Sequence, residues 1–204
     1  MLSYQTIEPH TLELLRQLMK EPLLAGTRLV GGTSLALQYG HRSSVDLDLF
    51  GQIECPPETL LDSLKQKGEV QVFSQRDKIR CYAIDDVRVD IVSYDYPWID
   101  EAVTEDGLRL ASPVDIAAMK IYAIENRGSR KDFIDIFFLL KRYSLAEILS
   151  FYRRKFPEHS EFVALRSLTY FEDAETYAMP VMFADMNWEE LKHSIIQTVT
   201  DYTK

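Results

Sequence analysis

The sequence is poor in cysteine, has no long apolar run and has no excess of basic residues. Its two cysteines, Cys55 and Cys81, do not have the spacing of metal ligands and are too few for a disulfide framework. No apolar run approaches the length that spans a membrane, and residues 1–15 lack the basic and apolar regions of a secretory signal. We therefore expect a cytoplasmic protein with no membrane partner.

Acidic residues outnumber basic ones, 32 to 23, so the net charge of −9 argues against general coating of nucleic acid. The charge is uneven along the chain. Residues 120–155 hold nine Lys or Arg and four Asp or Glu, whereas residues 156–204 hold three and nine. The segment 120–155 is therefore the best source of cations for an anionic ligand.

The hydrophobic pattern predicts an α+β protein whose 204 residues contain no repeat, low-complexity segment or flexible linker. In residues 1–111, helical spacing predicts helices, and β-type patterns predict strands that form a mixed sheet. The expected helices are 9–20, 33–39 and 56–67, and the expected strands are 27–30, 45–50, 69–74, 78–84 and 87–93. Residues 112–204 begin with a helix start signal, Ser112-Pro-Val-Asp115, and read as a helical half joined directly to the first.

A glycine pair, Gly31-Gly32, follows the expected strand 27–30 and precedes Thr33, Ser34 and a helix. Glycines allow close approach of a phosphate, and the amides at the start of a helix point towards it. Glycine pairs also end strands for steric reasons alone. This motif by itself is therefore weak support for an anion site.

Three aspartates on expected strands could bind divalent cations. Asp46 and Asp48 alternate with apolar residues and so share one face of a strand, and Asp90 has the same orientation on the strand 87–93. Like charges so close together repel unless a cation lies between them, and Mg²⁺ takes oxygen ligands shared with substrate phosphates. An exposed acidic face is the simpler alternative for the first pair. Together with the glycine pair, however, the three carboxylates favour two-metal phosphoryl chemistry.

The segment 119–140 brings basic residues and two more aspartates together. The expected helix 133–140 is apolar almost all round, and Asp132 and Asp135 share one of its faces. Buried carboxylates need partners. The available cations are Lys120, Arg127, Arg130 and Lys131. Either these groups form structural ion pairs between helices, or Lys120 contacts a triphosphate while Asp132 orients a ligand, and the sequence leaves both interpretations open.

Four motifs together resemble the AbiEii/AbiGii toxin family of nucleotidyltransferases, within the DNA polymerase beta-like superfamily. They are GGTSLAL, HRSSVDLDLF, VRVDIVS and AAMKIYAIENRGSRKDFIDIFFLL, and the tail LTYFEDAETYAMPVMF is also similar. The resemblance implies a polymerase-beta-like nucleotidyltransferase core in residues 1–111 and a helical domain, 112–204, that completes the active-site cleft. It also implies an enzyme that moves a nucleotide from an NTP to tRNA or another RNA, and a toxin or abortive-infection effector with an antitoxin encoded nearby.

The resemblance assigns roles to individual residues. Asp46 and Asp48 match the metal-binding pair, Asp90 the third carboxylate, and Lys120 and Asp132 the later motifs. We expect two Mg²⁺ ions, with Mn²⁺ as an alternative, on the three first-named aspartates. The expected nucleotide-binding residues are Gly31, Gly32, Thr33, Ser34, Arg42 and Lys120.

Two other interpretations remain at this point. The same fold could bind an NTP or a protein partner without transferring anything. The Asp-Leu-Asp pattern also occurs in phosphohydrolases of the haloacid-dehalogenase type, but that assignment needs an apolar strand before the first aspartate. The polar residues 41–44 stand there instead, so the phosphohydrolase interpretation is much the weaker.

Overall fold

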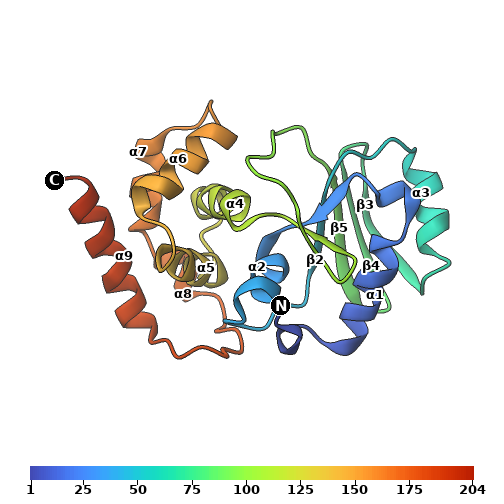
Figure 1. Cartoon of the computed structure of the whole chain (residues 1–204), viewed down its shortest axis with the longest axis horizontal. Coiled ribbons are helices and arrows are strands. Elements are labelled where there is room, and N and C mark those ends of the chain that lie inside the picture. The colour runs from blue at the N-terminus through green and yellow to red at the C-terminus, as the bar shows by residue number, and fades with distance from the viewer. The chain divides into compact units, whose positions relative to one another are not determined.

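The computed structural model describes residues 1–204, which form two compact units (Figure 1). Unit 1 consists of Met1–Asp95 and Ala102–Ala111, and unit 2 consists of Tyr96–Glu101 and Ser112–Lys204. The chain therefore passes between the units three times, because the short segment 96–101 belongs to unit 2 and the next ten residues belong to unit 1.

Unit 1 is built on a seven-stranded mixed sheet with the order β3-β4-β5-β2-β1-β7-β6. Its strands are β1 (Thr27–Leu29), β2 (Leu47–Gly51), β3 (Val70–Gln75), β4 (Ile79–Ile84), β5 (Val87–Ser93), β6 (Val103–Glu105) and β7 (Leu108–Leu110). The pairs β2–β5 and β1–β7 are parallel, and the other pairs are antiparallel. Its helices are η1 (Tyr4–Thr6), α1 (Pro9–Met19), η2 (Pro22–Leu24), α2 (Gly31–Tyr39) and α3 (Pro57–Leu64).

Period-two alternation sets the faces of the central strands. In β2, Leu47 and Leu49 are fully buried, whereas Asp48 between them is partly exposed. The apolar side chains of β2 and β5 form one core with the leucines of α1 and α3, which lie beside the sheet in Figure 1. Asp85 and Asp86 both adopt positive φ, 47° and 66°, as the tight turn of a twisted hairpin requires.

The structure confirms the strands and helices expected in residues 1–95, with differences at three boundaries and an addition beyond them. Strand β2 begins at Leu47, so the expectation that Val45 and Asp46 lie on it is wrong, because Val45 is exposed and has no core to alternate with. Helix α3 ends at Leu64, three residues earlier than expected. Helix α2 begins at Gly31, two residues earlier than expected, so the glycine pair lies inside its first turn. Strands β6 and β7 were not expected, since each is only three residues long. Arg109 anchors β7 by donating hydrogen bonds to the carbonyl oxygens of Met19, Leu24 and Thr27.

Unit 2 is helical, and its first helix begins at the start signal that the sequence predicts. Its helices are α4 (Pro113–Asn126), α5 (Arg130–Leu140), α6 (Leu145–Lys155), α7 (Glu161–Leu168), α8 (Glu172–Glu175) and α9 (Trp188–Tyr202). The Ser112 hydroxyl accepts a hydrogen bond from the Asp115 amide, and Ser144 and Glu147 form a reciprocal capping box. None of the helices is both long and apolar enough to span a membrane.

A buried ion pair attaches the segment 96–101 to unit 2. Lys155 Nζ lies 2.7 Å from Asp115 Oδ1, and both side chains are fully buried. The ammonium group also donates to the Pro97 carbonyl oxygen, 2.9 Å away, and the Asp115 carboxylate accepts from the amides of Ile99 and Asp100. One ion pair therefore holds α4, α6 and the segment 96–101 together.

Replacing Lys155 with methionine should destabilise unit 2 by about 3–5 kcal/mol, because the Asp115 carboxylate would remain buried without its cation. Urea unfolding followed by circular dichroism measures this loss. Lys204→Met, which removes an exposed ion pair with Asp201, should leave the transition unchanged. Equal stability of the two variants would contradict the role given to Lys155.

Candidate active site

The glycine pair allows two charged side chains to approach the backbone where β1 runs into α2. Gly31 has φ +67°, and a Cβ atom there would lie 2.5 Å from Asp48 Oδ2. A Cβ atom on Gly32 would collide with the guanidinium of Arg42, a side chain that is almost fully buried. The glycines are therefore needed because a carboxylate and a guanidinium pack directly against the first turn of α2.

The two hydroxyl residues after the glycines make contacts inside unit 1. Thr33 Oγ1 donates to the Asp46 carbonyl oxygen at 2.5 Å and lies 2.8 Å from the Ser44 hydroxyl. Ser34 Oγ accepts from Gln38 Nε2 at 3.2 Å, and both hydroxyl residues are buried. Thr33 thus fixes the backbone at Asp46 relative to α2, a positioning role that differs from direct contact with phosphate.

The parallel pairing of β2 with β5 places two of the predicted carboxylates side by side. Asp48 and Asp90 are direct partners in the register of these strands. Asp46 lies just before β2, and its backbone is held by Thr33. The charge of Asp46 also acts on Arg88, which is two residues from Asp90. The structure therefore brings all three aspartates into one electrostatic neighbourhood, next to the glycine pair.

The carboxylate of Asp90 has two different oxygens. Oδ2 accepts hydrogen bonds from Arg88 Nε at 3.2 Å and Arg88 Nη2 at 3.1 Å, whereas Oδ1 is buried and has no hydrogen-bond partner. Cys81 lies opposite Asp90 on β4. Burial and the nearby Asp90 carboxylate raise the pKa of the Cys81 thiol. A buried carboxylate oxygen without a donor is an attractive ligand for a cation.

The residues present fit a divalent cation, although they are not assembled as a complete metal site. No group of three or more His, Cys, Asp or Glu side chains has a metal-binding arrangement in the structure. Mg²⁺ is commonly held by one or two carboxylates, with water and substrate phosphates as the other ligands. Asp48, together with the unpartnered Oδ1 of Asp90, matches that kind of donor set.

The other two predicted catalytic residues, Lys120 and Asp132, form a buried cluster in unit 2. Lys120 Nζ lies 2.9 Å from Asp132 Oδ1 and 2.6 Å from Asp135 Oδ2. Arg127 donates from Nε and Nη2 to the two oxygens of Asp132, and Ser129 donates to Oδ2. The cluster therefore links α4 to α5, and Lys120 is bound by two carboxylates.

The charge state of Asp132 follows from this cluster. Burial alone would raise the pKa of its carboxyl group, but the charge of Lys120 and the hydrogen bonds and charge of Arg127 outweigh burial. The pKa of Asp132 is consequently held well below its ordinary value. Asp132 is an anion throughout the neutral range, suited to holding a cation and not to accepting a proton.

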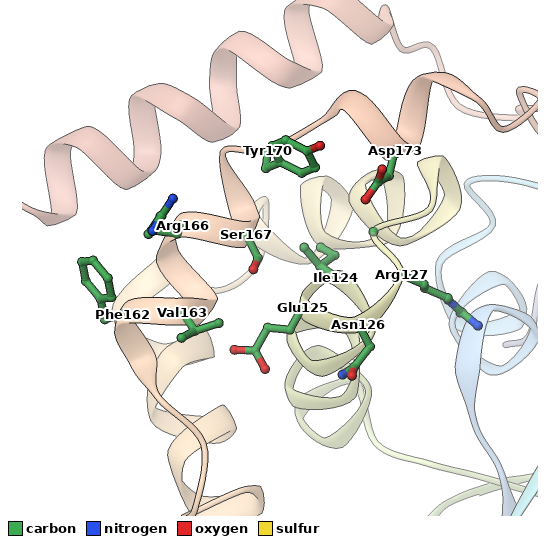
Figure 2. Close-up of a pocket in the computed structure, with 11 residues that line it drawn as sticks. Ile124, Glu125, Asn126, Arg127, Phe162, Val163, Arg166, Ser167, Tyr170 and Asp173 are labelled. Atoms are coloured by element: carbon green, nitrogen blue, oxygen red, sulfur yellow. The ribbon is translucent and has the colours of Figure 1, made fainter.

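Unit 2 also contains a pocket of about 350 Å³ between the end of α4 and the α7–α8 region (Figure 2). Figure 2 shows Glu125 pointing into this space, whereas Arg127 points away from it. The Glu125 carboxylate already accepts from the Tyr152 hydroxyl, at 2.7 and 2.8 Å. Because the Glu125 carboxylate already has this hydrogen-bond donor, the pocket does not indicate a particular ligand.

Two features of these sites were not expected from the sequence. The pattern Val-Arg-Val-Asp puts Arg88 and Asp90 on one face of a strand, which is the signal that could have indicated their ion pair. Nothing in the sequence pattern pairs Lys155 with Asp115, which are 40 residues apart.

The depressed pKa of Asp132 predicts how the stability of unit 2 depends on pH. The ion-pair cluster contributes fully above the unfolded pKa of about 3.9, and the contribution is lost as the pH falls further. Below pH about 4, wild type should lose up to about 1.4 kcal/mol per pH unit more than Asp132→Asn. Urea unfolding at several pH values between 3 and 7 measures the difference, with the exposed Asp62→Asn as control. Parallel pH profiles for wild type and Asp132→Asn would contradict it.

Sequence comparison finds a relative in Aquifex aeolicus (strain VF5), the uncharacterized protein aq_aa25. It is 31% identical over 182 residues, which cover 85% of this chain and 86% of the relative. Among solved structures, JHP933 from Helicobacter pylori is similar with a TM-score of 0.58 and 20% identity, covering 95% of this chain and 92% of that one. A presumed nucleotidyltransferase from H. pylori gives a TM-score of 0.56 at the same identity.

These structural similarities concern the fold, and they confirm the expected α+β class with its polymerase-beta-like core. The family model described as "Nucleotidyl transferase AbiEii toxin, Type IV TA system" matches residues 13–203, almost the whole chain. The match spans the glycine pair, the three aspartates of unit 1 and the Lys120 cluster of unit 2. The chain therefore belongs to the AbiEii nucleotidyltransferase toxin family and is a nucleotidyltransferase.

Proposed function

We propose that the protein transfers a nucleotide from an NTP to a hydroxyl group of RNA, with tRNA as the favoured acceptor, and that it requires Mg²⁺. In this reaction the acceptor oxygen forms a bond to the α-phosphorus, the bond to the β-phosphate oxygen breaks, and pyrophosphate leaves while the hydroxyl proton passes to solvent. The family description also supports a role as the toxin of a toxin–antitoxin system with an antitoxin partner.

The observation that carries this proposal is the pairing of Asp48 with Asp90 on adjacent parallel strands, with Asp46 close by. Two like charges in such positions favour a shared divalent cation. We assign Asp46 and Asp48 to both cations and Asp90 to the cation near the acceptor hydroxyl. When bound there, Mg²⁺ would neutralise phosphate charge and lower the pKa of the attacking hydroxyl.

The first turn of α2 supports phosphate binding by its backbone. The amides at the start of a helix have no partner within the helix and point out of its end, and the glycine pair adds no side chain of its own beside Asp48 and Arg42. Gly31 and Gly32 would therefore contact the β- and γ-phosphates through the backbone, while Thr33, Ser34 and Arg42 hold the turn in place.

For Lys120, in unit 2, we propose a role in binding phosphate. Asp132 and Asp135 fix the position of its ammonium group, and Arg127 and Ser129 fix Asp132 in turn. Catalysis would depend on positioning and electrostatics, because no covalent intermediate is needed for this transfer.

Labelling RNA with each of four α-³²P NTPs in the presence of Mg²⁺ tests the transferase. We expect one NTP to label a tRNA-sized band, and Asp48→Asn and Asp90→Asn to reduce labelling at least about a hundredfold, because each removes a negative cation ligand. Addition of EDTA should abolish the labelling as completely as the substitutions do.

Asp62→Asn is the matched control, since Asp62 is an exposed aspartate on α3 and its replacement changes the net charge equally. Full activity in Asp48→Asn would refute the assignment of the carboxylates. Label in protein and none in RNA would refute RNA as acceptor while leaving the transferase intact. Mg²⁺-dependent NTP binding without any labelled product would identify a binding module instead.

A further inference from the structure

Arg88 occupies a position within the proposed cation site that the transfer reaction does not explain. It lies on β5, two residues before Asp90 and on the same face of the strand. Its Nε and Nη2 atoms both donate to Asp90 Oδ2, at 3.2 and 3.1 Å. Its side chain is 54% exposed, whereas that of Asp90 is 22% exposed, so the arginine reaches the carboxylate from the solvent side.

The charges around Arg88 show what it neutralises. Its two side-chain hydrogen bonds and its ion pair all go to the Asp90 carboxylate. Cys81, the neighbour of Asp90 on β4, supplies no positive charge to that carboxylate. The guanidinium of Arg88 is therefore the cation that pairs with the Asp90 carboxylate.

We propose that Arg88 is an internal counter-ion that competes with the divalent cation for the Asp90 carboxylate. This inference rests on the proposed function, because it takes Asp90 as a cation ligand. When no metal is bound, the guanidinium is the cation next to the Asp90 carboxylate.

Arg88 is thus a positioning residue that acts through Asp90. Keeping the carboxylate paired lowers the repulsion between Asp90 and Asp48 when no metal is bound. A divalent cation that binds Asp90 Oδ1 must then share the carboxylate with the guanidinium on Oδ2, and the positive charge of the guanidinium opposes its binding. The ion pair therefore stabilises the two carboxylates when no metal is bound. It also raises the concentration of divalent cation that is needed for binding.

Mn²⁺ binding measured by electron paramagnetic resonance, without nucleotide, tests the competition directly. Arg88→Gln should bind Mn²⁺ about three- to tenfold more tightly than wild type, because a partly exposed ion pair no longer competes. Arg88→Lys keeps a cation and should stay within about twofold of wild type. Arg76→Gln, in the exposed turn after β3, removes the same charge and should have no effect.

Asp90→Asn, made alone and together with Arg88→Gln, separates this inference from the proposed function. Weakened Mn²⁺ binding in Asp90→Asn, with tighter binding in Arg88→Gln that the second substitution removes, supports both. Weakened binding in Asp90→Asn without any gain in Arg88→Gln overturns the competition and leaves the cation site intact. Mn²⁺ affinity that does not respond to Asp90→Asn overturns the cation site itself.

Discussion

The parallel pairing of β2 with β5 is the constraint on which unit 1 depends. It places Asp48 directly beside Asp90, so the sheet that gains stability from buried leucines and valines also holds two negative charges together. Much of the local structure responds to that repulsion. Gly31 leaves space for the Asp48 carboxylate, and Arg88 pairs with Asp90. The parallel pairing therefore explains why an arginine and a glycine are needed beside these two aspartates.

In unit 2, buried carboxylates are neutralised by lysines that are buried with them. Lys120 lies against two carboxylates, and Lys155 lies against one carboxylate and a backbone carbonyl group. Neither buried ammonium group is therefore left without a partner. Such pairs contribute less net stability than apolar packing of the same volume, but removal of one partner is strongly destabilising. They fix the orientation of α4 relative to α5 and α6, which apolar side chains alone would define less sharply.

Short-range patterns in the sequence predicted most of the strands, the helix starts and the residues of the two polar clusters, because alternation and capping are local properties. Strands β6 and β7 were not predicted, because three residues are too few to show the alternation of apolar and polar side chains that marks a strand. The inward hydrogen bonds of Thr33 and the ion pair of Lys155 with Asp115 depend on partners that only the folded chain brings close. The ion pair of Arg88 with Asp90 was not expected either, although residues two apart on a strand share a face.

The excursion of residues 96–101 bears on how this protein can be divided or rebuilt. A cut after Ala111 gives two pieces, each continuous in sequence, but it leaves the first piece holding six residues whose carbonyl and amide groups complete the Lys155–Asp115 pair in the other. Neither piece would then be a self-sufficient module. The two units of this chain are in this sense interleaved in sequence, so a functional exchange of unit 2 must carry residues 96–101 with it.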